Sequence, residues 1–231
     1  EAPDFLEEML ARFEGGFPKT AEFSAYARST LREISSRDDP DAALVAWMER
    51  EEALFRTLER HLLAEKLNKL VQDGMQDVEP IIKLVQSSLQ RRKSRAGSAL
   101  ENHLEQVFKD HCITYTRTGV TEKNLRPDFI FPGISQYHDA RFPQAHLTML
   151  ASKSTCKDRW RQILNEAARI PEKHLLTLEP SISENQTSEM KNEKVQLVVP
   201  LSLHQTFSMA QQSWLMDLRG FVSAVQKKNL I

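Results

Sequence analysis

The sequence has few cysteines and no long apolar run, and these two features argue against a disulfide-rich protein and a membrane-spanning protein. Its two cysteines, Cys112 and Cys156, are too few for a disulfide framework, and no CxxC pair or Cys/His ladder indicates structural zinc. No apolar run approaches the ~20 residues that a membrane span needs. The first residues are acidic where a signal peptide would be basic. We therefore expect a globular protein without a membrane segment, in a reducing cytoplasm.

The net charge of −1 conceals an uneven distribution of charge along the chain. Residues 1–60 contain 8 Lys or Arg against 14 Asp or Glu, whereas residues 61–231 contain 23 against 18. The basic residues gather at 91–95 and at 153–161. Such clusters can neutralise phosphates, although a basic run is more often a solvated surface. Composition alone therefore leaves a nucleic-acid partner open.

Residues 1–92 have helical periodicity and lack strand signals. Apolar residues recur at intervals of three and four from Leu44 to Leu70, which predicts a helix over residues 41–71. After a break at residues 72–74, a further helix is expected through about residue 90. This pattern describes packing faces and assigns them no chemistry.

From residue 93 onward, strand signals alternate with helical ones. Helices are predicted for 94–110, 157–169 and 211–227, and short strands for 113–116, 127–131, 147–153, 174–178 and 195–199. The resulting order, α-β-β-β-α-β followed by further elements, predicts an α/β fold with a mixed central sheet flanked by helices. We therefore divide the chain into a helical region, 1–92, and a core, 93–231.

An acidic residue and a lysine each stand at the end of a strand-like segment. Asp128 follows Pro127 and precedes an apolar strand, and Lys153 closes the strand that begins at Leu147. If the two strands are neighbours, these ends lie within several ångströms of each other. A carboxylate is a hard oxygen ligand that suits Mg²⁺, and a lysine can stabilise negative charge or orient a water. Such pairs are nevertheless common by chance.

These residues resemble a known family, the PD-(D/E)XK restriction endonucleases, and within it the EcoRII catalytic-domain group. The resemblance rests on residues 94–97, 126–129 and 147–153, and above all on the run 153–162. It extends from about residue 40 to the C-terminus and implies the αβββαβ restriction-endonuclease-like core. It further implies a type II catalytic domain that hydrolyses double-stranded DNA with Mg²⁺ at a CCWGG-like site, as a homodimer in a bacterial-type restriction-modification system.

The chain departs from the general motif of this family at Ala151. The motif places an acidic residue two positions before the lysine, where an alanine cannot bind metal. The resemblance implies that the acid is displaced onto the following helix, so that Asp128 and Glu166 are the expected metal ligands. A helical period of 3.6 residues puts Glu166 on one face with Arg159 and Gln162. The alternative is a solvated helix glutamate.

The resemblance implies two further residues near the site. Glu101 would be a second acid that binds metal or orients water, although neighbouring Glu105 is easily confused with it. Tyr137 would belong to the catalytic site, together with Asp128, Lys153 and Glu166. Its alternative is a role in packing a loop.

The resemblance also assigns DNA recognition to Lys157, Asp158 and Arg159. Arginine and lysine donate to guanine O6 and N7, and aspartate accepts from cytosine N4, so these residue types suit the reading of G·C pairs. Their alternative role is phosphate contact together with an internal salt bridge of Asp158.

Two other functions stay open at this level. A DNA-binding protein that does not cleave would keep residues 157–159 without needing the acids, and the presence of Asp128, Lys153 and Glu166 together argues against it. A helical interaction module with an accidental motif is supported by the acidic first sixty residues. In the favoured hypothesis, residues 1–92 supply dimer or DNA contacts.

Overall fold

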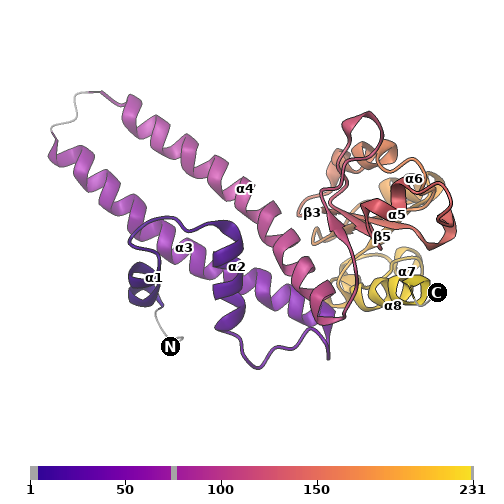
Figure 1. Cartoon of the computed structure of the whole chain (residues 1–231). Coiled ribbons are helices and arrows are strands. Elements are labelled where there is room, and N and C mark those ends of the chain that lie inside the picture. The colour runs from indigo at the N-terminus through magenta and orange to yellow at the C-terminus, as the bar shows by residue number, and fades with distance from the viewer. Residues whose placement is uncertain (1–4, 74–76, 230–231) are drawn as a thin grey trace. The chain divides into compact units, whose positions relative to one another are not determined.

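The computed structural model describes residues 5–73 and 77–229, and the chain divides into two compact units (Figure 1). The helical unit comprises Glu1–Ile34 and Ala46–Asn102, and the sheet unit comprises Ser35–Val45 and His103–Ile231. Two long helices, α3 (Pro40–Gln72) and α4 (Glu79–Asp110), contribute residues to both units. Within residues 5–73 and 77–229, no helix is long and apolar enough to cross a membrane.

The helical unit is held together by an aromatic core. Its other helices are α1 (Leu6–Arg12) and α2 (Thr20–Ser29). The Arg95 guanidinium lies 4.9 and 4.7 Å from the ring centres of Phe23 and Phe55, and donates a hydrogen bond of 2.9 Å to the Pro18 carbonyl. The buried members of this core are Met9, Phe23, Tyr26, Ala27, Leu54, Phe55, Leu58 and Leu62.

The expected interruption between residues 90 and 94 is wrong, because α4 is one continuous helix. Arg92 donates to Glu59 of α3 at 2.6 Å, and the Arg91 guanidinium lies 4.0 Å from the centre of the Phe17 ring. These tertiary contacts override the local signal for a new helix start. The basic cluster at 91–95 is therefore largely engaged in packing. The predicted break after Gln72 agrees with the end of α3, and Gly74 lies outside the described residues.

The sheet unit contains one five-stranded sheet in the order β1-β2-β3-β4-β5. The strands are β1 (Thr116–Arg117), β2 (Phe129–Phe131), β3 (Thr148–Lys153), β4 (Lys173–Thr177) and β5 (Val195–Val198). β1, β2 and β3 pair antiparallel, and β3, β4 and β5 pair parallel. The predicted mixed sheet is confirmed, although residues 113–115 lie outside β1.

Short helices and 3-10 segments complete the sheet unit. They are η1 (Glu122–Asn124), α5 (Ile134–His138), η2 (Gln144–His146), η3 (Lys157–Asn165), α6 (Glu184–Asn192), η4 (Leu201–Thr206), α7 (Met209–Gln212) and α8 (Leu218–Asn229). The predicted helix over 211–227 is thus two helices separated by a turn. A second correction concerns residues 157–169, where an α-helix was expected and a 3-10 helix ends at Asn165.

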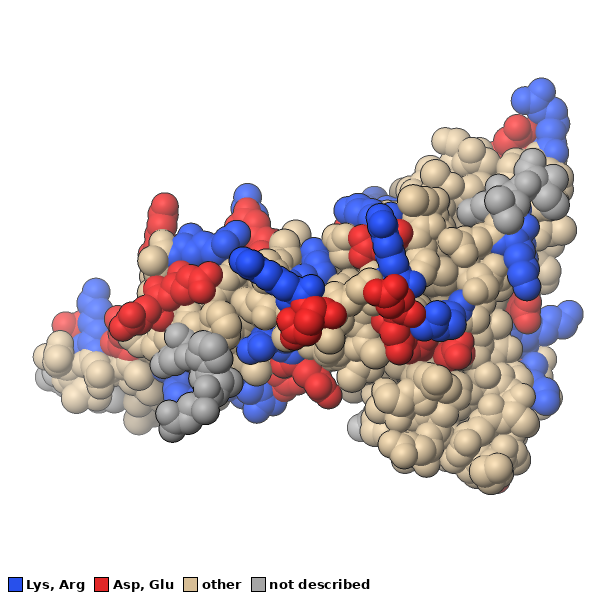
Figure 2. Space-filling model, turned by 90° about the horizontal axis from the view of Figure 1, so that it is seen from below, with Lys and Arg blue, Asp and Glu red and all other residues tan. Residues whose placement is uncertain are grey.

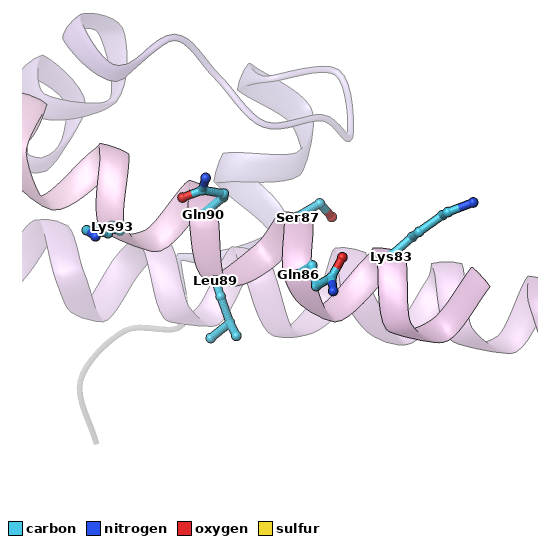
Figure 3. Close-up of a pocket in the computed structure, with 6 residues that line it drawn as sticks. All are labelled: Lys83, Gln86, Ser87, Leu89, Gln90 and Lys93. Atoms are coloured by element: carbon cyan, nitrogen blue, oxygen red, sulfur yellow. The ribbon is translucent and has the colours of Figure 1, made fainter. Parts of the chain in front are cut away.

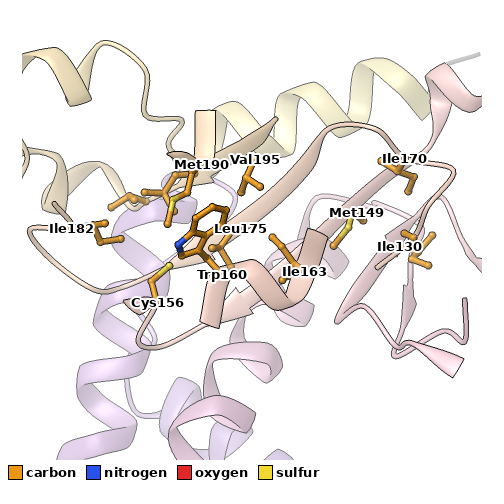
Figure 4. Close-up of a cluster of buried hydrophobic side chains, with 14 of the residues drawn as sticks. Ile130, Met149, Cys156, Trp160, Ile163, Ile170, Leu175, Ile182, Met190 and Val195 are labelled. Atoms are coloured by element: carbon orange, nitrogen blue, oxygen red, sulfur yellow. The ribbon is translucent and has the colours of Figure 1, made fainter. Parts of the chain in front are cut away.

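Both faces of the sheet are covered by apolar side chains. On one face, Ile130, Met149 and Leu175 pack with Trp160 of η3 and Met190 of α6 (Figure 4). On the other face, the Phe129 and Phe131 rings each lie 5.1 Å from Phe108 of α4, and Phe131 lies 5.7 Å from Phe221 of α8. Side chains alternate between the faces of a strand, which explains why neighbouring residues of β2 enter different cores.

Asp41 ties the beginning of α3 into the sheet unit. Its buried carboxylate accepts hydrogen bonds from the backbone amides of Leu201 at 3.1 Å, Leu218 at 2.8 Å and Arg219 at 2.9 Å. The amides of Leu218 and Arg219 belong to the first turn of α8, where they lack partners within the helix. Hydrogen bonds from Asp41 therefore join residues 35–45 to the sheet unit.

Candidate active site

Asp128 and Lys153 meet at the ends of two neighbouring strands. β2 and β3 are antiparallel with Phe129 opposite Leu150, so the residue before β2 lies beside the last residues of β3. The Lys153 ammonium is 3.1 Å from Asp128 Oδ2, and the same oxygen accepts from the Ser152 amide at 2.7 Å and its hydroxyl at 3.2 Å. The Asp128 and Lys153 side chains are 15% and 22% exposed, so the pair is largely buried yet open to solvent.

Glu166 joins this pair through a geometry that the sequence pattern did not suggest. It caps η3 in an extended conformation, with φ −77° and ψ 144°, and does not lie on an α-helix. A 3-10 helix has three residues per turn, so residues 160, 163 and 166 follow one row. Trp160 and Ile163 of that row are buried, whereas Arg159 and Gln162 are exposed. The predicted sharing of a face with Arg159 and Gln162 is therefore wrong, and Glu166 continues the inward row.

The electrostatics of Glu166 show that it lies near the other site residues. Burial raises the pKa of the Glu166 carboxyl, the charge of Asp128 raises it further, and Lys153 and Lys173 oppose both effects. A second carboxylate close to Asp128 in a poorly solvated place favours a bound cation, which offsets the like charges. The arrangement thus offers two hard oxygen donors beside one ammonium group.

Ala151 contributes packing and no ligand. It is fully buried and belongs to the hydrophobic cluster around Trp160. An acidic side chain at this position would place an uncompensated charge in that apolar cluster. Glu166 as the second metal carboxylate stays a prediction.

Tyr137 lies in a hydrogen-bond network with Glu122. Its hydroxyl donates to the Glu122 carboxylate at 2.6 and 2.7 Å and accepts from the Arg169 amide at 3.3 Å. Burial and the bond to Glu122 raise the pKa of Tyr137 to about 12, so the hydroxyl stays protonated at neutral pH. The residue is buried, and its hydroxyl links the Glu122 carboxylate to the backbone at Arg169. Its part in catalysis stays a prediction.

Glu101 and Glu105 lie in different units. Glu101 is a half-buried residue of α4 within the helical unit. Glu105, one turn later, belongs to the sheet unit and accepts from the Tyr115 hydroxyl at 2.9 Å and from Arg117 at 3.4 Å. Glu105 is thus engaged in holding β1, and the role of Glu101 stays a prediction.

The expected recognition segment begins just after Lys153. The side chains of Lys157 and Asp158 lie outside the described residues, whereas Arg159 is exposed and donates to the Thr155 carbonyl at 3.2 Å. The Cys156 amide donates to the Glu179 carboxylate, which anchors the start of η3. Burial, followed by the charge of Glu179, raises the pKa of the Cys156 thiol to about 12, so this cysteine is not a nucleophile at neutral pH.

Three polar residues near the site had no sequence signal strong enough to identify them. Ser152 binds Asp128, Glu122 binds Tyr137, and Lys173 carries a buried charge at the first position of β4. The best available signal was Lys173, a charged residue at the start of an apolar strand. On the face shown in Figure 2, basic and acidic side chains stand beside one another, so the charge asymmetry of the sequence does not appear there as separate surfaces.

Comparison with known proteins places residues 55–222 on the family model described as EcoRII C terminal. The chain is 43% identical over 210 residues to the type II restriction enzyme EcoRII of Escherichia coli, covering 90% of this chain and 50% of that protein. It is 30% identical over 114 residues to the type II restriction enzyme SsoII of Shigella sonnei, covering 45% and 36%. The chain thus spans half, or less, of the length of these curated relatives.

Solved structures share the fold at low sequence identity. Metal-depleted Ecl18kI in complex with uncleaved DNA superposes with a TM-score of 0.77 at 19% identity, covering 97% of this chain and 83% of that one. The PspGI restriction endonuclease in complex with substrate DNA gives 0.73 at 15% identity, covering 92% and 93%. At such identities the likeness concerns the architecture alone.

Proposed function

Because the chain belongs to the EcoRII C-terminal domain family, we propose that it is the catalytic domain of a type II restriction endonuclease. It would hydrolyse phosphodiester bonds of double-stranded DNA with Mg²⁺, at a CCWGG-like site. The observation that carries this proposal is the Lys153 ammonium 3.1 Å from Asp128 Oδ2, with the Glu166 carboxyl close enough to respond to both charges. A protein that only binds DNA has no need of this group.

The donor set suits Mg²⁺. Asp128 and Glu166 supply hard carboxylate oxygens, and all three hydrogen bonds to Asp128 go to Oδ2, so that Oδ1 accepts none within the described residues. No group of three or more His, Cys, Asp or Glu side chains gathers there as a metal cage in the described part of the chain. Mg²⁺ commonly binds through one or two carboxylates and takes its other ligands from water and substrate phosphate.

In this mechanism each side chain has a separate task. When bound, Mg²⁺ supplies a Lewis acid for the scissile phosphate and promotes deprotonation of the attacking water. Asp128 and Glu166 would hold the cation through their carboxylate oxygens. Lys153 has three donors, one of which is fixed on Asp128, and the others would orient the water and stabilise the charge that develops on the phosphate. Glu101 would assist as a further acid.

Recognition is assigned to Lys157, Asp158 and Arg159. The proposal is supported by the exposure of Arg159 and by the anchoring of this segment through the Cys156 amide on Glu179, only a few residues from Lys153. Donors on arginine and lysine and an acceptor on aspartate suit G·C pairs of CC and GG half-sites.

Duplex cleavage tests this function directly. We expect Mg²⁺-dependent cleavage of a duplex that contains one CCWGG site and much slower cleavage of a duplex with the same composition in scrambled order. Ca²⁺ in place of Mg²⁺ serves as the control for binding without hydrolysis, and the products are resolved on a denaturing gel. Binding of the CCWGG duplex with no cleavage in Mg²⁺ would instead favour the non-cleaving DNA-binding alternative.

We also propose that the chain acts as a homodimer, with the helical region 1–92 in the contact. A palindromic or pseudopalindromic site calls for a two-fold symmetric reader. Near the start of α4, four exposed apolar residues follow a spacing of four, three and four: Val78, Ile82, Val85 and Leu89, at 64%, 43%, 51% and 58% exposure. An antiparallel copy of this row places Ile82 opposite Val85 and Val78 opposite Leu89, so the row is complementary to itself.

Leu89 also lines a shallow surface hollow of about 620 Å³ on the same helix (Figure 3). The other residues of the hollow are Lys83, Gln86, Ser87, Gln90 and Lys93. Leu89 gives the hollow an apolar wall, against which an apolar side chain of a second copy would pack.

The dimer contact is tested by the double substitution Val85→Glu and Leu89→Glu. In this register each new carboxylate lies opposite an apolar residue of the second copy, Ile82 or Val78, and would be buried without a partner. We therefore expect a monomer in sedimentation velocity where the unaltered chain sediments as a dimer. Asn192→Glu, an exposed change at the end of α6 and outside the helical region, is the control and should leave the mass unchanged. A dimer that persists in the double variant places the contact elsewhere.

A further inference from the structure

Glu166 begins a turn that no regular element supports. We call residues 166–170 the Glu166 turn. Ala167, directly after Glu166, has φ +47°, a left-handed conformation that residues other than glycine adopt only at a cost of ~1–3 kcal/mol. Such a conformation persists when surrounding contacts enforce it. The orientation of the Glu166 carboxylate therefore depends on whatever fixes this turn.

Lys173 holds the turn from inside the protein. Its side chain is buried, with the residue only 5% exposed, and its ammonium donates to the Ala167 carbonyl at 2.7 Å and to the Ile170 carbonyl at 2.6 Å. The two carbonyls thus share one cation across the turn. Glu166 and Glu122 supply the nearby negative charge that favours keeping this lysine protonated against the effect of burial on its pKa.

Glu122 holds the same turn through its amides. Its carboxylate accepts from the Ala168 amide at 3.2 Å and from the Tyr137 hydroxyl, which in turn accepts from the Arg169 amide. The Arg169 side chain extends to the carbonyls of Asp139 at 3.1 Å and Phe142 at 2.9 Å. The turn is thereby bound at its carbonyls by Lys173 and at its amides by Glu122 and Tyr137.

We propose that Lys173 and Glu122 are positioning residues that hold the Glu166 turn from two sides and so fix the second metal carboxylate beside Asp128 and Lys153. The inference rests on the proposed function, because it concerns a ligand of the metal site proposed above. Neither residue needs to touch metal or DNA. Groups that orient metal ligands change metal affinity or activity by 10- to 100-fold when they are replaced.

Metal binding without DNA tests this inference independently of cleavage. The probe is Mn²⁺, whose free concentration is followed by electron paramagnetic resonance, with folding checked by circular dichroism. Lys173→Met removes the donors and keeps the length of the side chain, and we expect its Mn²⁺ dissociation constant to rise about 10-fold or more. Glu122→Gln, a change at an exposed residue, should act in the same direction and keeps the test valid if Lys173→Met does not fold. Lys191→Met, on the exposed surface of α6, is the matched control.

A double variant distinguishes positioning from general loosening of the structure. If Lys173 acts through Glu166, adding Lys173→Met to Glu166→Gln should change Mn²⁺ affinity little further. Unchanged affinity in both single variants overturns the inference, as does an equal loss in the Glu166→Gln background. A chain that binds no Mn²⁺ removes both the inference and the metal site. A chain that binds Mn²⁺ through Glu166 and never cuts DNA removes the proposed function alone.

Discussion

Replacing Lys153 with methionine is expected to slow single-turnover DNA cleavage by about 10²- to 10³-fold, the size of effect seen when a preorganised charge-stabilising group is removed. DNA affinity should change little. The ammonium lies 3.1 Å from Asp128, and in the proposed mechanism it would stabilise charge that appears only in the transition state. Binding would instead depend mainly on surface groups such as the exposed Arg159. The side chain of methionine has similar length and carries no charge or donor.

The measurement separates the two steps by the choice of cation. Binding is measured by gel shift in Ca²⁺, and the cleavage rate is measured after mixing with excess Mg²⁺ at saturating protein. The exposed Lys191→Met variant carries the same change of charge and should cleave at the normal rate. If Lys153→Met cleaves as fast as the unaltered chain, the site lies somewhere other than the ends of β2 and β3.

The second large effect is a loss of stability in acid that depends on His174. This histidine is 5% exposed and its ring packs 5.2 Å from that of Phe221. Burial, together with the charge of Lys228, lowers the pKa of His174 to about 4, from an ordinary value of 6.5. The folded state keeps the ring neutral while the unfolded state takes up a proton below pH 6.5. The contribution of the neutral His174 ring to stability is therefore fully present above pH 6.5. The free energy of unfolding falls by about 3 kcal/mol as the pH approaches 4.

Urea unfolding at a series of pH values checks this expectation. In the unaltered chain, the free energy of unfolding of the sheet unit should fall between pH 6.5 and 4. In His174→Leu this fall should be smaller by the contribution of His174. His138→Gln, at an exposed position, should retain the full decline. Parallel pH dependences for the unaltered chain and His174→Leu would mean that other groups control the acid response.

The positions of Asp128 and Lys153 could be predicted from the sequence, because each residue is next to an apolar strand that short-range patterns identify. Asp128 directly precedes one apolar strand and Lys153 ends the next, and antiparallel pairing brings the start of the first strand beside the end of the second. The same reasoning identified Glu166 as a candidate and misjudged its surroundings. Spacing along residues 157–169 is compatible with α-helical and 3-10 periods, and only packing of Trp160 and Ile163 against the sheet decides between them.

Contacts between distant residues explain what could not be predicted. Lys173 binds carbonyls only a few positions away, yet its role depends on a turn whose shape the sequence does not signal. Glu122 reaches Ala168 across 46 positions, and Arg92 reaches Glu59 across 33. Such pairings follow from the fold, so helix starts and anchoring residues that depend on them are invisible to periodicity and local cap signals.

Asp41 has a consequence for the order in which the chain folds during synthesis. Its partners at the start of α8 are 177 and 178 positions further along the chain, whereas every residue of the helical unit has been made once Asn102 is in place. Ribosomes add on the order of 5–20 residues per second, so the helical unit has several seconds to form before Leu218 exists. We expect the first turn of α3 to stay frayed throughout that interval and to become fixed only when the last helix emerges.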